Sequence, residues 1–309
     1  MYVIDLIKRI LHAANITIFI YLLLNIGVVS VLVYYMFHLQ PWQSALAGLG
    51  VYMLSLMLAL SPFGEWILRV TNRCRKIKNV EILNFIEPIF IDVKREAKSI
   101  YPMIPEDVVI FLNESEDPFA FATGRKTVCI SMGMLRRPEE EIRAALAHEF
   151  GHLAHRDTDL LLMVTVGNLI VQLILFGIRL VLIITELIVG VVGAMLGGED
   201  GFVAVALTFL YRVAWTVMLG IISWVWNAIG MILVMRASRQ NEFAADEFAF
   251  NLGYGMPLCE LLKSVDFGGY SGLFSSIASS HPPKEERIAR LRALMGIAIP
   301  EDITNDTGV

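Results

Sequence analysis

The chain has 309 residues, and 56% of them are hydrophobic, which is high for a soluble protein. Its mean hydropathy of +0.63 points the same way, so membrane-spanning segments are expected. The net charge of -5 is mild and gives no support for nucleic-acid binding. The three cysteines lie far apart without a C-x-x-C pair, which argues against a disulfide framework and a thiolate metal site.

Two apolar segments open the chain. No Asp, Glu, Lys or Arg occurs between Arg9 and Glu65, and residues 16–37 are long enough to cross a bilayer. After a short polar turn, residues 45–60 form a second expected span. We therefore predict a transmembrane hairpin over residues 1–68. A cleaved signal peptide fits less well, because the first apolar segment is too long for one.

Basic residues cluster directly after this hairpin. They are Arg69, Arg73, Arg75, Lys76 and Lys78. Because basic residues are enriched in cytoplasmic loops, residues 69–159 are predicted to form a cytoplasmic domain. Within it, residues 80–101 are expected to be helical, and residues 108–112 and 127–131 are expected to be strands of a small sheet.

The next stretch contains the pattern H-E-x-x-H, formed by His148, Glu149 and His152. Glu139–Glu141 precede it and favour the positive end of a helix. On a helix, the two histidines lie one turn apart on the same face and can bind one Zn²⁺ ion. Glu149 can then take a proton from the attacking water. The alternative is a surface helix with two unrelated histidines.

Two long apolar stretches follow, at residues 160–196 and 202–235, and predict a second transmembrane pair over residues 160–236. Three charged residues interrupt them, and such residues are costly in lipid. We expect a structural ion pair among them and not a catalytic role. They are Arg179, Glu186 and Arg212.

The C-terminal part, residues 237–309, is predicted to be cytoplasmic and to supply the third metal ligand, Glu242. An even number of spans must separate Glu242 from the histidines, and the two apolar stretches provide two. A carboxylate ligand leaves a fourth position for water, as catalytic zinc requires. Asp246 or Asp157 can accept the distal N–H of a ligand histidine. The alternative for Glu242 is a solvated helix carboxylate.

Two further residues are candidates for contact with the developing oxyanion, namely His281 and Arg287. His281 precedes a double proline, which makes it a loop residue. From spacing alone, an incidental histidine and a surface arginine are favoured over a catalytic role. His155 has no defined role, because a fourth protein ligand would close the metal site.

Taken together, these motifs resemble the HtpX-like membrane zinc metallopeptidases, relatives of the CaaX prenyl proteases. The resemblance covers nearly the whole chain. It rests on the two-span start, the H-E-x-x-H helix with Asp157, the two later spans, Glu242-Phe243-Ala244-Ala245-Asp246, and His281-Pro282-Pro283 with Arg287.

The resemblance implies that His148, His152 and Glu242 bind zinc and that Glu149 is the general base. It also strengthens the assignment of His281 and Arg287 as catalytic groups. Members of that family degrade misfolded or damaged membrane proteins in the bacterial cytoplasmic membrane, and they cut on the cytoplasmic side.

An exposed strand edge near the metal is a natural place to bind an extended peptide through main-chain hydrogen bonds. We expect the strand at 127–131 to be that edge, although the sheet can also be scaffold alone. One departure is Phe119, which stands where the family usually has Asn and cannot supply amide hydrogen bonds. The residues assigned to substrate binding are Ala120, Phe121, Val128, Cys129 and Ile130.

The sequence therefore predicts a mainly α membrane protein with four transmembrane helices. These carry a cytoplasmic α+β zincin-type catalytic domain with a small β-sheet. The predicted function is a zinc endopeptidase of the inner membrane that acts on protein or peptide substrates, above all membrane proteins, in membrane protein quality control. The alternative is a non-enzymatic, zinc-stabilised membrane scaffold or chaperone-like adaptor. An intramembrane protease fits less well, because charged residues directly precede the metal helix.

Overall fold

The structure of the protein is a computed structural model that describes residues 16–59, 61–264 and 282–297. The chain divides into two compact units. We call residues 20–56 and 164–233 the helical unit, and residues 1–19, 57–163 and 234–309 the sheet unit. The two long helices α7 (Asp157–Leu196) and α8 (Gly198–Asn251) contribute residues to both units.

The helical unit consists of α2 (Ile16–Phe37), α3 (Pro41–Ala59) and the middle parts of α7 and α8. Two segments in the described part of the chain are long and apolar enough to cross a membrane, Val171–Gly193 and Gly201–Ile229. Both belong to the second predicted pair of spans. In the first pair, Phe19–Tyr35 is a shorter apolar helix, so the count of four spans remains a prediction.

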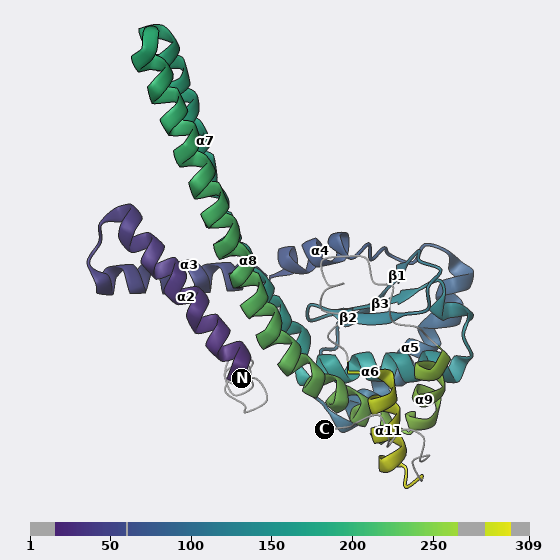
Figure 1. Cartoon of the computed structure of the whole chain (residues 1–309). Coiled ribbons are helices and arrows are strands. Elements are labelled where there is room, and N and C mark those ends of the chain that lie inside the picture. Colours follow the sequence, from purple (N-terminus) through teal and green to yellow (C-terminus); the bar gives the residue numbers. More distant parts are fainter. Residues whose placement is uncertain (1–15, 60, 265–281, 298–309) are drawn as a thin grey trace. The chain divides into compact units, whose positions relative to one another are not determined.

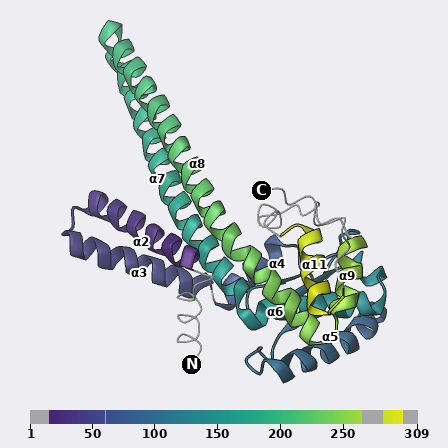
Figure 2. The ribbon, with the colours of Figure 1, turned by 60° about the horizontal axis from the view of Figure 1, so that its bottom comes forward.

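Helices α7 and α8 lie side by side and run antiparallel (Figure 2). A single residue with positive φ, Gly197, separates them. Further along the pair, Arg212 on α8 forms an ion pair with Glu186 on α7. This confirms the expected structural ion pair for two of the three charged residues.

The sheet unit is arranged in layers, with helices on both sides of a three-stranded sheet (Figure 1). Helix α4 lies on one side, and α6 lies between the other side of the sheet and α9. The elements are α4 (Pro62–Thr71), α5 (Val80–Ile100), β1 (Val109–Asn113), β2 (Ala120–Thr123), β3 (Thr127–Ser131), the short 3₁₀ helix η2 (Met134–Arg136), α6 (Glu139–His155), α9 (Gly255–Ser264) and α11 (Lys284–Leu294).

The order of the strands corrects one prediction. The order is β1-β3-β2, with β1 parallel and β2 antiparallel to β3. The strand at 127–131 is therefore central and buried on both sides, and β2 is the edge. The sequence analysis did not predict β2. Its signal was a short run of alternating large and small residues before a glycine-containing turn, which is typical of a hairpin.

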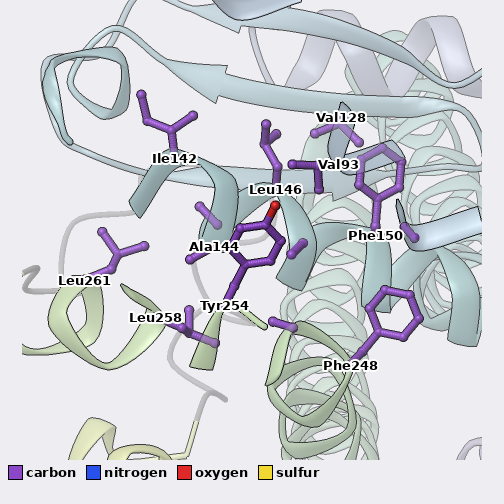
Figure 3. Packing of buried hydrophobic residues seen from close by; sticks show 14 of the residues in the cluster. Val93, Val128, Ile142, Ala144, Leu146, Phe150, Phe248, Tyr254, Leu258 and Leu261 are labelled. Carbon is purple, nitrogen blue, oxygen red and sulfur yellow. The ribbon is translucent and has the colours of Figure 1, made fainter. Parts of the chain in front are cut away.

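The hydrophobic core of the sheet unit lies around α6 (Figure 3). Leu146 and Phe150 on this helix are fully buried, and the Phe150 ring lies 5.5 Å from the ring of Phe90 on α5. Val128 packs against α6 from the sheet, and Leu258 packs against it from α9. Burial of α6 on these sides fixes its rotation, which determines where its polar residues point.

Candidate metal centre

Helix α6 carries three of the predicted site residues, His148, Glu149 and His152. It begins after Pro138, and the acidic residues of its first turn suit the positive end of the helix. It ends at His155, and Arg156 caps it with a left-handed φ of 57°, its backbone N–H donating to carbonyls of the last turn. His148 and Glu149 are buried, and His152 is partly exposed.

A close approach of two helices brings the third ligand to this face of α6. Gly151 lies against Ala245 of α8, and a Cβ atom at position 151 would lie only 2.9 Å from the Cα of Ala245. Glu242 and Asp246 flank Ala245 on α8, and both are buried. The absence of a side chain at Gly151 therefore allows the carboxylates of α8 to reach the histidines of α6.

The three predicted ligands form a compact cluster, with one ligand atom from each lying within 4.8 Å of the others. The Nε2 atoms of His148 and His152 are 3.2 Å apart. Carboxylate oxygens of Glu242 lie 3.5 Å from Nε2 of His148 and 3.4 Å from Nε2 of His152. Ligand bonds of about 2.0–2.1 Å at tetrahedral angles place ligand atoms roughly 3.3 Å apart, so these residues fit a zinc ion.

Asp246 lies next to the ligand cluster, where it contacts His148 of the cluster and also Arg287. One oxygen lies 2.9 Å from Nδ1 of His148, the ring nitrogen that faces away from the other ligands. The carboxylate also accepts hydrogen bonds of 2.8 and 2.6 Å from Nε and Nη2 of Arg287. Nη1 of Arg287 lies 3.2 Å from Glu242. Asp246 and Arg287 thus orient one histidine ligand and the carboxylate ligand.

These contacts decide the protonation of the buried groups. Burial raises the pKa of Asp246, but the charge and hydrogen bonds of Arg287, together with the contact to His148, outweigh this effect and hold the pKa below its ordinary value. Burial lowers the pKa of His148, but hydrogen bonds to Asp246 and Glu242 outweigh it and raise the pKa. Asp246 is therefore an anion that can accept the N–H of a ligand imidazole.

Glu149 points toward the sheet. Its Oε2 atom accepts a hydrogen bond of 2.6 Å from the backbone N–H of Ala122 in β2. The sequence analysis missed Ala122, because its contribution is a backbone group on a strand that was not predicted. This hydrogen bond places the edge of the sheet directly beside the predicted general base.

The register of β2 shows which backbone groups face outward. The N–H of Ser131 donates to the carbonyl of Phe119, and Phe121 is paired with Cys129. Since hydrogen bonds alternate along an antiparallel pair, the N–H and C=O groups of Ala120 and Ala122 point away from β3. Ala120 therefore belongs to an edge of the sheet that is not paired with another strand among the described residues.

The residues predicted to bind substrate lie on two different strands, the edge strand β2 and the central strand β3. Val128, Cys129 and Ile130 lie in the central strand, buried between β1 and β2. Their assignment as an edge was wrong, because β2 covers the side on which a peptide was expected to bind. Phe121 lies on the outer strand, and its ring lies 6.0 Å from that of Phe119. The face of the edge strand is therefore aromatic where the family usually has Asn.

The remaining predicted site residues lie outside the ligand cluster or outside the described part of the chain. Arg287 is buried, and its guanidinium is directed at Asp246 and Glu242, which favours positioning of these carboxylates over contact with an oxyanion. His281 lies outside the described residues, as does the side chain of Asp157. His155 packs its ring against Phe248 and is not part of the ligand cluster formed by the described residues.

Comparison with known proteins agrees with this geometry. Residues 92–295 match the model of peptidase family M48. Protease HtpX of Hahella chejuensis is 28% identical over 311 residues, which cover 89% of this chain and 98% of that protein. Protease HtpX of Stenotrophomonas maltophilia (strain K279a) is 28% identical over 227 residues, which cover 65% and 70% of the two chains.

A solved structure is also similar, the crystal structure of S. mikatae Ste24p. It has 18% sequence identity and a TM-score of 0.41, and the match covers 86% of this chain but only 61% of that one. The family match includes all three residues of the ligand cluster. The chain belongs to peptidase family M48 and is an HtpX-like membrane metalloprotease.

Proposed function

We propose that this protein is a zinc-dependent endopeptidase that cleaves membrane proteins on the cytoplasmic side of the inner membrane. The observation that carries the proposal is the cluster of His148, His152 and Glu242 with Glu149 beside it. Three protein ligands leave a fourth position for water, which is typical of catalytic zinc. A role in degrading misfolded or damaged membrane proteins is part of the proposal and follows from the HtpX-like resemblance.

In this mechanism, a bound zinc ion supplies a Lewis acid that polarises the substrate carbonyl and acidifies water. Glu149 takes a proton from the attacking water and later passes it to the leaving amine. Asp246 and Arg287 hold His148 and Glu242 in place through the contacts described above. His281 remains a proposed donor to the oxyanion.

The substrate is proposed to bind as an additional strand along β2. The outward N–H and C=O groups of Ala120 and the C=O of Ala122 are available by register for main-chain hydrogen bonds. The N–H of Ala122 is bonded to Glu149, so a peptide on this edge would lie directly beside the general base. Such binding depends little on substrate sequence, as a protease of damaged proteins requires.

The cytoplasmic location of the site is supported by chain topology. Two candidate spans lie between His152 and Glu242, and a chain that crosses a bilayer twice returns to the same side. The basic residues after α3 favour the cytoplasmic side for the segment that precedes the metal helix. The assignment of residues 69–159 and 237–309 to the cytoplasm rests on these two observations.

The test is proteolysis of an unfolded model protein by the detergent-purified chain, with bound zinc counted. Glu149→Gln keeps an acceptor for the N–H of Ala122 and removes the base, so it is expected to bind one zinc and lose about 10²–10⁴-fold in rate. Equal cleavage by the wild type and this variant would show that Glu149 is not the base. If neither cuts and both hold zinc, the scaffold function replaces the proposal.

A further inference from the structure

Helix α4 has two contrasting faces. Gly64, Glu65 and Leu68 are buried against the sheet unit. The opposite face is apolar but exposed, and its four residues follow the i, i+3, i+4, i+7 spacing of one helix face. Their exposed fractions are 52% for Phe63, 55% for Trp66, 43% for Ile67 and 59% for Val70.

The buried face is tied to the turn between β2 and β3, which fixes the rotation of α4. One carboxylate oxygen of Glu65 accepts the backbone N–H groups of Arg125 and Lys126, and the other accepts the hydroxyl of Thr127. Gly124 has a φ of +61°, and a Cβ atom there would lie 2.9 Å from Glu65. Because these bonds hold the inner face, the helix cannot turn its apolar face inward.

The sequence segment that contains the apolar face is rich in basic residues. From Ser61 to Asn79 the only acidic residue is Glu65, and it is buried. Five basic residues lie in the same segment, and all but the partly exposed first one are exposed. They are Arg69, Arg73, Arg75, Lys76 and Lys78. Arg75 forms an ion pair with Glu114, and Arg73, Lys76 and Lys78 are the other exposed cations. The segment therefore combines exposed aromatic side chains with several exposed basic residues.

We propose that α4 docks on the headgroup region of an anionic lipid bilayer, with Phe63 and Trp66 inserted and the basic residues against lipid phosphates. Aromatic residues favour membrane interfaces, and basic segments bind anionic leaflets. Helix α4 begins within three residues of the end of α3, a predicted span, so the chain keeps it near the bilayer. A second copy of this chain fits less well, because it would bring two sets of cations together.

Docking of α4 on the bilayer would also affect the proposed proteolysis. The docking proposal itself does not require that the protein cleaves peptides. Glu65 bonds the turn that ends β2, and β2 donates its Ala122 N–H to Glu149. A docked α4 would therefore hold the edge strand at a set distance from the membrane surface. The experiment reads lipid contact directly, so its outcome is independent of whether the protein cuts peptides.

The full chain is reconstituted in phosphatidylcholine vesicles with and without phosphatidylglycerol, using lipids brominated near the headgroup or near the chain end. Subtracting the tryptophan emission of Trp66→Phe from that of the wild type gives the emission of Trp66. We expect lipids brominated near the headgroup to quench the Trp66 emission more strongly than lipids brominated near the chain end. We also expect this quenching to be stronger in vesicles that contain phosphatidylglycerol. The double variant Lys76→Glu/Lys78→Glu is expected to lose that increase.

Two results would overturn the proposal. Emission from Trp66 that is insensitive to brominated lipid in both vesicle types would show that the face is not docked on the bilayer. Quenching that is the same with and without phosphatidylglycerol, and is unchanged in Lys76→Glu/Lys78→Glu, would exclude anionic lipid as the partner. Disulfide cross-linking between copies of Trp66→Cys would instead identify a second copy of this chain.

Discussion

Asp246 is the residue that links the ligands of the metal centre to the rest of the sheet unit. It contacts Nδ1 of His148 and binds Arg287 through two hydrogen bonds, and Arg287 in turn contacts Glu242. All four side chains are buried, so little water is available to replace a lost partner. The positions of the predicted metal ligands thus depend on a residue that is not itself a predicted ligand.

We predict that Asp246→Asn reduces zinc affinity by about 10–100-fold, the usual effect of removing a partner of a ligand histidine. The amide can no longer act as an anion toward both His148 and Arg287. Zinc competition with a chromogenic chelator measures the affinity. Glu247→Gln is the matched control, because it removes a negative charge from the exposed neighbouring position on α8. Equal affinities in the two variants would show that Asp246 has no such role.

At the scale of elements, the metal centre depends on the crossing of α6 and α8. Helical spacing alone places His148 and His152 on one face, but Glu242 comes from a helix about ninety positions later in the chain. The contact between Gly151 and Ala245 sets the distance between the two helices. A side chain at position 151 would move one helix away from the other.

Gly151→Ala is therefore expected to weaken zinc binding and to destabilise the protein by about 1–3 kcal/mol, the range for overpacked cores. Thermal unfolding and bound zinc are the measurements. Gly50→Ala serves as the control, because Gly50 lies in α3 with open space where its Cβ would be. If both variants retain full zinc and unfold like the wild type, the crossing tolerates a larger separation than proposed.

The second element is the edge strand β2. Proline is tolerated on an edge strand where the missing N–H faces outward. Ala120→Pro should therefore preserve β2 and zinc binding but remove one outward donor. The loss of one main-chain hydrogen bond to substrate, worth about 1 kcal/mol, should raise KM roughly fivefold with little change in kcat. Unchanged steady-state kinetics in a folded, zinc-bound variant would place the substrate elsewhere.

For the whole molecule, the main consequence is topological. If α7 and α8 each cross the bilayer once, the hairpin tip and the metal centre lie on opposite sides. Met195→Cys, at an exposed position near the tip, and Glu87→Cys, at an exposed position of α5, provide two probes. We expect a membrane-impermeant thiol reagent to label them from opposite sides of the inner membrane, with wild-type labelling as the baseline. Labelling from the same side would contradict the two-span arrangement.

Local sequence was sufficient for the features that depend on neighbouring residues. The helix at 139–155 and its pair of histidines follow from a spacing of four and an acidic first turn. The helix at 80–100 and the strand at 127–131 also lie where the sequence predicted them. Long apolar runs predicted the helices of the helical unit, because the length and composition of a span are themselves local properties.

The sequence by itself thus determined the family, and it predicted the three residues that the structure brings together as candidate metal ligands and, as a hypothesis, the general base. Tertiary structure decided the order of the strands, because pairing joins residues whose partners no local pattern specifies. It gave Arg287 a positioning contact, placed the N–H of Ala122 on Glu149, and bound Glu65 to the β2–β3 turn. Each of these contacts joins segments that are distant in sequence, and packing of the whole unit determines which groups meet.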